Sequence, residues 1–116
     1  MLVAVVDDDE SVRESLPDLL RELGFAAHAF ASAQEFLTSG VVDQARCLVL
    51  DIAMPGMSGP DLQQELRERH KSIPIVFITA HRGEAMRIRA SGMECLFKPF
   101  SEQALEEALH GALGTH

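Results

Sequence analysis

Five short apolar runs alternate along the 116-residue chain with segments whose apolar residues recur at helical spacing. Three of the runs carry Val, Ile and Leu on consecutive positions, which is typical of strands covered on both faces. Strands that alternate with helices indicate βαβ crossovers, and therefore one parallel sheet with helices on both sides. The predicted strands are residues 2–6, 25–30, 47–50, 73–78 and 95–97.

Two of the predicted helices carry a local conflict. A leucine stripe runs through residues 12–23 and ends at Gly24, but Pro17 lies inside it. A proline in a helix interior removes a backbone hydrogen bond and costs about 3 kcal/mol. We expect a kink there, because the stripe continues past the proline. Residues 86–90 alternate with a period of two, as a strand does, but a parallel strand pair needs a crossover there, so we assign a short helix.

Charge and hydropathy limit the partners of the chain. The formal net charge is −8, so we expect no direct binding of nucleic acid or of anionic membrane. The chain contains neither a signal peptide nor the about 20 apolar residues of a membrane span, and it is therefore expected in the cytoplasm. Cys47 and Cys95 lie in apolar runs without metal-binding spacing, and we expect free, buried thiols.

Polar residues follow four of the apolar runs. Asp7 and Asp8 follow the first run, and the third, fourth and fifth runs are followed by Asp51, Thr79 and Lys98. In a parallel α/β sheet, ligands gather at the carboxyl ends of the strands. Clustered carboxylates repel one another unless a cation lies among them, and oxygen ligands favour Mg²⁺. We therefore expect these five side chains around one Mg²⁺ site.

This combination of residues suits phosphoryl transfer. An aspartate that is ionised at neutral pH is a nucleophile that needs no general base. The metal and Lys98 would offset charge on the phosphoryl oxygens, and Thr79 would donate a hydrogen bond to one of them. Each residue taken alone is more often an ordinary turn or strand-end residue, and an acidic run is more often a helix start. Their joint occurrence at successive strand ends favours the functional interpretation, whereas Asp9 and Glu10 are assigned to the start of the first helix.

The sequence resembles the receiver domain of two-component response regulators. The segments that carry the resemblance are residues 5–10, 48–59, 78–80 and 98–100, which read VVDDDE, LVLDIAMPGMSG, ITA and KPF. It is most similar to the nitrogen-fixation regulator type, whose members commonly carry a LuxR-like DNA-binding domain. The resemblance implies a single domain over residues 1–116 with a (βα)5 flavodoxin-like three-layer sandwich and the sheet order 2-1-3-4-5.

The resemblance also implies roles for the site residues. Asp51 would be the phosphoacceptor, receiving its phosphoryl group from a phosphohistidine of a sensor histidine kinase or a histidine phosphotransfer protein. Asp8 would bind Mg²⁺ directly and Asp7 through water, with the backbone carbonyl of Ala53 as a further ligand.

Further roles concern the switch that follows phosphorylation. Lys98 would pair with Asp51 before the reaction and with the phosphoryl group after it, and the Lys98–Pro99 bond would be cis. Thr79 would move toward the phosphoryl group and shift the population of the output face. The protein would phosphorylate itself and lose the group slowly, so it would be a switch rather than a turnover enzyme. A phosphorylation-dependent dimer is compatible with this class.

Three features depart from the family pattern. The position three residues before the lysine usually holds an aromatic residue but is Cys95 here, and Phe97 is a candidate substitute. Only eighteen residues, 80–97, separate Thr79 from Lys98, fewer than in typical relatives, so we expect an altered or mobile output face. Ala53 is too small and apolar to position an attacking water, and hydrolysis should be slow unless His81 compensates.

Two other classes of protein share part of this residue pattern. A phosphatase of the haloacid-dehalogenase type also uses a strand-end aspartate and Mg²⁺, but it needs a second aspartate where this chain has Ala53. A degenerate receiver that only binds proteins would usually lack one of the acidic residues, and none is missing here. A stand-alone receiver and the front of a longer transcription factor both fit the sequence.

Overall fold

Five parallel strands form one sheet in the order β2-β1-β3-β4-β5, as predicted. The computed structural model describes residues 1–114. The strands are β1 (Leu2–Val6), β2 (Ala26–Phe30), β3 (Cys47–Asp51), β4 (Ile75–Thr79) and β5 (Glu94–Phe97). All their boundaries lie within two residues of the predicted ones. The largest shift is at β4, which begins after Pro74 because proline has no N–H to donate to a sheet.

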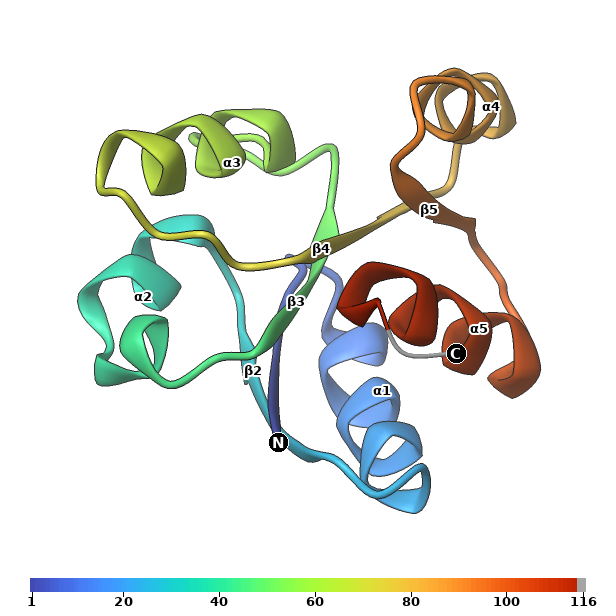
Figure 1. The fold of residues 1–116 in the computed structure, drawn as a ribbon, viewed down its shortest axis with the longest axis horizontal. Helices are drawn as coiled ribbons and strands as arrows, with labels where there is room; N and C mark the ends of the chain where they lie inside the picture. Colours follow the sequence, from blue (N-terminus) through green and yellow to red (C-terminus); the bar gives the residue numbers. More distant parts are fainter. Residues whose placement is uncertain (115–116) are drawn as a thin grey trace.

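Helices cover both faces of the sheet and produce three layers (Figure 1). α1 (Glu10–Glu22) and α5 (Glu102–Leu113) pack on one face. α2 (Ala33–Thr38), α3 (Gly59–Glu68) and α4 (Arg82–Ala90) lie on the other face, and a short 3-10 helix, η1 (Gly40–Asp43), follows α2. The flavodoxin-like α/β architecture is thereby confirmed.

Both helices with conflicting patterns are present. α1 continues past the buried Pro17 to Glu22, so the proline does not end it. Residues 86–90 belong to α4, which confirms the helix assignment. α4 has nine residues, against thirteen in α1 and twelve in α5, and Ala85 is its only buried residue. The short segment between Thr79 and Lys98 therefore yields a short helix with a small contact to the sheet.

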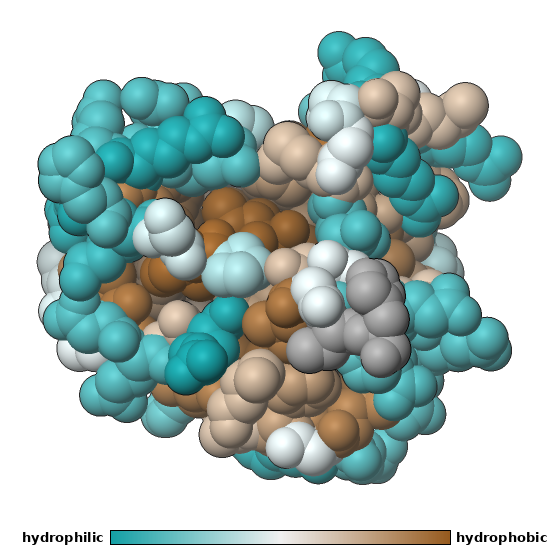
Figure 2. Space-filling view, in the orientation of Figure 1, coloured by the Kyte–Doolittle hydropathy of each residue, from teal (hydrophilic) through white to brown (hydrophobic). Residues whose placement is uncertain are grey.

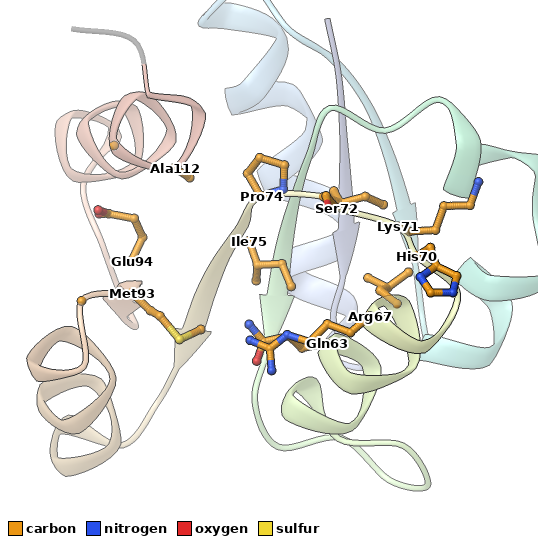
Figure 3. A pocket seen from close by; sticks show the side chains of 14 residues that line it. Gln63, Arg67, His70, Lys71, Ser72, Pro74, Ile75, Met93, Glu94 and Ala112 are labelled. Carbon is orange, nitrogen blue, oxygen red and sulfur yellow. The ribbon is translucent and has the colours of Figure 1, made fainter.

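Apolar side chains fill both sides of the sheet. β1 and β3 are buried almost throughout, as consecutive apolar residues of central strands should be. Figure 2 shows polar atoms over the outer surfaces of the helices and apolar atoms in the hollow between α3 and α4. This hollow is a cavity of about 730 Å³ whose lining includes Leu66, Ile75 and Met93 (Figure 3). It lies at the amino ends of β4 and β5, at the opposite end of the sheet from Asp51.

The fold bears on the state of the two cysteines and on the membrane expectation. Cys47 and Cys95 are both free and buried, as expected. Burial raises the pKa of each thiol to about 11. Among the helices of residues 1–114, none combines the length and the apolar character needed to cross a membrane.

Candidate functional site

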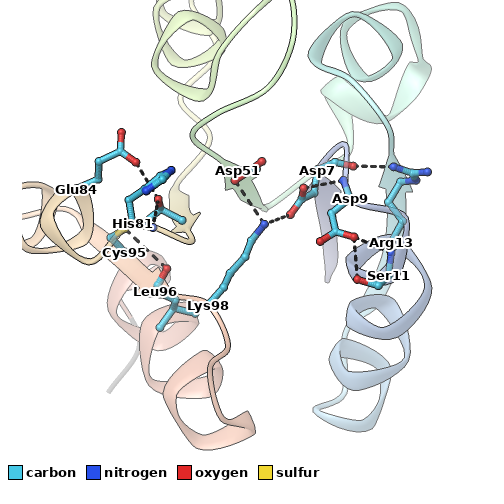
Figure 4. A network of polar contacts seen from close by, with 11 residues as sticks. Asp7, Asp9, Ser11, Arg13, Asp51, His81, Glu84, Cys95, Leu96 and Lys98 are labelled. Carbon is cyan, nitrogen blue, oxygen red and sulfur yellow. Dashed lines mark hydrogen bonds and ion pairs between the residues drawn. The ribbon is translucent and has the colours of Figure 1, made fainter.

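The carboxyl ends of the strands bring Asp7, Asp51 and Lys98 together (Figure 4). Asp7 directly follows β1, Asp51 ends β3 and Lys98 directly follows β5. The Nζ atom of Lys98 lies 2.8 Å from Oδ2 of Asp7 and 3.5 Å from Oδ1 of Asp51. Asp7 is 0% exposed and Asp51 is 6% exposed, so both carboxylates are removed from solvent. The ammonium group therefore bridges two buried carboxylates that lie 44 positions apart in the sequence.

Asp8 completes an acidic cluster with the other two aspartates. One carboxylate oxygen from each of Asp7, Asp8 and Asp51 lies within 4.8 Å of the others. Asp8 is exposed, so the cluster opens to solvent on its side. Ala53 stands two residues after Asp51 in the loop that leaves β3. The cluster offers hard oxygen ligands with an open side, which is the donor set that Mg²⁺ prefers.

The electrostatic balance of the cluster is unfavourable without a cation. Burial, followed by the negative charge of Asp7, raises the pKa of Asp51 to about 7, although Lys98 acts in the opposite direction. Burial also disfavours the charged form of Lys98, but the hydrogen bond and charge of Asp7, together with Asp51, outweigh it and raise the pKa of Lys98. Asp51 is therefore only partly ionised at neutral pH when no cation is bound. A cation in the cluster would favour the ionised form of Asp51 that the sequence predicts.

Gly59 fixes the backbone at the end of β3, and the sequence analysis did not single it out. A Cβ atom at this position would lie 2.5 Å from the carbonyl oxygen of Asp51 and 3.0 Å from Cα of Ile52. The Gly59 N–H donates to the carbonyl oxygen of Ile52 at 2.9 Å. Ser58 precedes it as the N-cap of α3 and forms a capping box with Asp61. A glycine immediately after a helix-capping serine was the available signal for this close approach.

Thr79 is placed at the carboxyl end of β4, but its hydroxyl group bonds within its own loop. It is 1% exposed, donates to Oε1 of Glu84 at 2.9 Å and accepts from the backbone N–H of His81 at 3.0 Å. Glu84 lies in the first turn of α4, and His81 is the N-cap residue of that helix. Figure 4 shows both on the side of the site away from Asp7. No pattern in the sequence marked Glu84, because a contact five residues ahead depends on the path of the loop.

Cys95 and its candidate aromatic substitute, Phe97, both lie on β5. Cys95 is 2% exposed, whereas Phe97 is half-buried and pairs with Thr79 in the strand register. The guanidinium carbon of Arg82 lies 5.1 Å from the centre of the Phe97 ring, within range of a cation–π interaction. Phe97 therefore lies beside Thr79, at the place where an aromatic substitute would be needed. The substitution itself stays a prediction.

Two smaller expectations are confirmed at this edge. The Lys98–Pro99 peptide bond is cis. Asp9 is the N-cap of α1, and its side chain accepts hydrogen bonds from Ser11. These bonds lower the pKa of Asp9, and Glu10 begins the helix. Both residues belong to the helix start, as the sequence analysis assigned them.

A doubly wound parallel sheet with acidic side chains and a lysine at the carboxyl ends of its strands defines a class of α/β protein that binds its ligand at this edge. A family model of the response regulator receiver domain matches residues 3–110. The chain therefore belongs to the response regulator receiver family.

Relatives and solved structures agree with this assignment. The chain is 45% identical over 114 residues to nodulation protein W of Bradyrhizobium diazoefficiens, covering 96% of the chain and 50% of that protein. It is 39% identical over 117 residues to the transcriptional regulatory protein FixJ of Azorhizobium caulinodans, covering 97% and 54%. The crystal structure of the response regulator TrrA of Thermotoga maritima, in complex with Mg²⁺ and beryllium fluoride, superposes with a TM-score of 0.82 at 28% identity, covering 97% and 98%. The chain spans about half the length of the curated relatives it matches.

Proposed function

We propose that Asp51 accepts a phosphoryl group from a phosphohistidine of a sensor histidine kinase or a histidine phosphotransfer protein. The observation that carries this proposal is the position of the Asp51 carboxylate, which lies 3.5 Å from the ammonium group of Lys98 and in one cluster with the carboxylates of Asp7 and Asp8. Family membership supports a signalling switch, and the burial of Asp51 supports a reaction protected from bulk water.

The donor set fits Mg²⁺, and we assign the ligands as follows. Asp8 and Asp51 would bind the ion directly, Asp7 would bind it through water, and the backbone carbonyl of Ala53 would supply a further oxygen. Three carboxylates with one ammonium group leave excess negative charge, which a divalent cation offsets. When bound, the ion neutralises charge on the phosphoryl oxygens.

Asp51, Lys98 and Thr79 would each have a separate role in the transfer of the phosphoryl group. A carboxylate oxygen of Asp51 attacks phosphorus, the new O–P bond forms as the N–P bond of the phosphohistidine breaks, and the electron pair stays on the imidazole nitrogen. Lys98, already 3.5 Å from Asp51, would transfer its pairing to a phosphoryl oxygen. Thr79 would donate its hydroxyl hydrogen to another oxygen. The product is a switched state, and we therefore regard the protein as a self-phosphorylating switch and not as a turnover enzyme.

A groove beside the site suits a protein donor. A cavity of about 490 Å³ lies between α1 and the turn after β5, lined by the apolar Val12, Leu16 and Phe100 and bordered by Lys98. Because the groove is continuous with the site, we assign it to an amphipathic helix that presents the phosphohistidine. Val12→Glu should slow transfer from a protein donor and leave the reaction with a small phosphodonor unchanged. If Val12→Glu accepts the phosphoryl group from the protein donor as fast as the wild type does, the groove is not the donor's binding site.

Further functions would reside outside this segment. The names of several relatives describe transcriptional regulators, and the net charge of −8 makes residues 1–116 unsuited to binding DNA themselves. We therefore propose that the phosphorylated domain controls a DNA-binding output elsewhere in the protein, with a phosphorylation-dependent dimer as one route. The two free thiols fit a reducing compartment, and we place the protein in the cytoplasm.

The test is incubation with a small phosphodonor, with Mg²⁺ or with a chelator, followed by intact-mass measurement. We expect a mass increase of one phosphoryl group that requires Mg²⁺ and is absent in Asp51→Asn. The phosphoryl group should then be lost slowly, because Ala53 cannot orient water, and His81→Ala reports whether His81 takes part. A folded protein that never gains mass would instead be a degenerate receiver that only binds proteins.

A further inference from the structure

The hydroxyl hydrogen of Thr79 already has an acceptor in this structure. Thr79 is almost fully buried, and it donates to the Glu84 carboxylate at 2.9 Å while the backbone N–H of His81 donates to it. A threonine hydroxyl has one hydrogen to donate. It therefore donates fully either to Glu84 or to a phosphoryl oxygen on Asp51, and the two acceptors compete for it.

Before phosphorylation, Glu84 is the acceptor of the Thr79 hydroxyl hydrogen, and two features strengthen this hydrogen bond. Its side chain is only partly exposed, and a carboxylate is a stronger hydrogen-bond acceptor than a neutral group. Its position in the first turn of α4 also favours a negative charge, because that end of the helix carries a partial positive charge. If Thr79 donates its hydrogen elsewhere, the Glu84 carboxylate can turn toward solvent.

We propose that Glu84 is a positioning residue that holds Thr79 in the unphosphorylated orientation and is displaced when a phosphoryl group forms on Asp51. The inference rests on the proposed function, because it needs a phosphoryl group that attracts Thr79. The hydrogen bond between Thr79 and Glu84 opposes activation, because it has to break before the Thr79 hydroxyl group can reorient toward the phosphoryl group.

The contact also gives the signal a route to α4. Arg82 lies in the same first turn as Glu84 and covers Phe97, which is the strand-register partner of Thr79. One turn of helix therefore touches both Thr79 and the aromatic ring beside it. Release of Glu84 would remove one of the contacts between this turn and the sheet, while Arg82 stays on Phe97 and Ala85 stays in the core.

The affinity for beryllium fluoride with Mg²⁺, used as a phosphoryl mimic, tests the inference. Glu84→Ala should bind the mimic more tightly, by roughly three- to tenfold, because the competing charge-assisted hydrogen bond is gone. Glu84→Gln keeps a neutral acceptor of the same shape and should lie between Glu84→Ala and the wild type. Glu102→Ala, which removes a carboxylate from the first turn of α5, is the matched control and should bind as the wild type does.

A second set of variants separates positioning from a purely structural role. In a Thr79→Val background, Glu84→Ala should leave the affinity unchanged, because there is no hydroxyl group left to release. A gain in affinity that persists in this background, or no gain in either Glu84 variant, would overturn the inference. Failure of the wild type to bind the mimic, or binding that survives in Asp51→Asn, would contradict the proposed function instead.

Discussion

Lys98 lies closer to Asp7 than to Asp51, with Nζ–O distances of 2.8 and 3.5 Å. The family resemblance led us to expect its pairing with Asp51 before the reaction, and the structure shows one ammonium group shared by two buried carboxylates. Asp7 therefore holds the lysine in place next to Asp51. A cation bound by the acidic cluster would weaken the ion pair between Asp7 and Lys98 and leave Lys98 available to a phosphoryl oxygen.

Replacing Lys98 should impair the site without unfolding the domain. Lys98→Met removes a positive charge that lowers the pKa of Asp51, so this pKa should rise above about 7 in metal-free protein. Phosphorylation should slow by on the order of a hundredfold, the scale of losing one electrostatic stabiliser of a transition state. A carbon NMR titration of the carboxyl group and a phosphodonor time course measure the two effects. Lys71→Met, which removes a surface lysine paired with Asp43, is the control and should change neither.

The affinity for Mg²⁺ should depend on pH. Because burial and Asp7 raise the pKa of Asp51 to about 7, a proton competes with the metal for this carboxylate below that pH. The apparent affinity should therefore fall as the pH decreases from 7 toward 5. Calorimetric titration at several pH values would show it, and Asp51→Asn should lose this dependence. A constant affinity across that range would contradict the assigned ligand.

Asp51 should destabilise the metal-free fold at neutral pH. Its pKa is higher in the folded chain than the ordinary 3.8, so the folded state binds more protons and stability falls as the pH rises from about 4 to about 7. Asp51→Asn removes the buried charge and should raise the free energy of unfolding at pH 8 by on the order of 2 kcal/mol. Urea unfolding with and without Mg²⁺ measures this difference. A variant less stable than the wild type at pH 8 would contradict the electrostatic account of the cluster.

Gly59 should tolerate no larger residue. A Cβ atom 2.5 Å from the Asp51 carbonyl oxygen forces the backbone apart, so Gly59→Ala should cost about 2–3 kcal/mol of stability and slow phosphorylation. Thermal unfolding and the phosphodonor reaction measure the two losses. Gly83→Ala is the matched control, because a Cβ atom there meets nothing within 4 Å and α4 should gain slightly from alanine. Equal behaviour of the two variants would show that the close approach is relieved at little cost.

The strands of this fold and their parallel arrangement could be predicted because local residues marked them. Consecutive apolar positions predicted the strands, and the alternation with helices predicted the parallel sheet. Since parallel strands end at one edge, the same reasoning placed Asp7, Asp51 and Lys98 together, and their contacts confirm it.

Other features of the site depend on loop conformation and burial, which the pattern of apolar and polar residues does not encode. The bond from Thr79 to Glu84 depends on the rotamer of a buried threonine and the turn before α4. The pKa of Asp51 depends on how completely the folded chain excludes water, and the residue types alone predicted an ordinary ionised aspartate. Gly59 belonged to a recognised segment, but its role follows from a backbone contact seen only in three dimensions.

The most direct test of the switch is to locate the phosphoryl group chemically. After reaction with a phosphodonor and Mg²⁺, borohydride reduces an aspartyl phosphate to homoserine, and peptide sequencing by mass spectrometry then identifies the position. We predict homoserine at position 51 alone, absent when Mg²⁺ is chelated. Homoserine at Asp7 or Asp8, or none in a protein that has gained the mass of a phosphoryl group, would contradict the assignment of Asp51 as the phosphoacceptor.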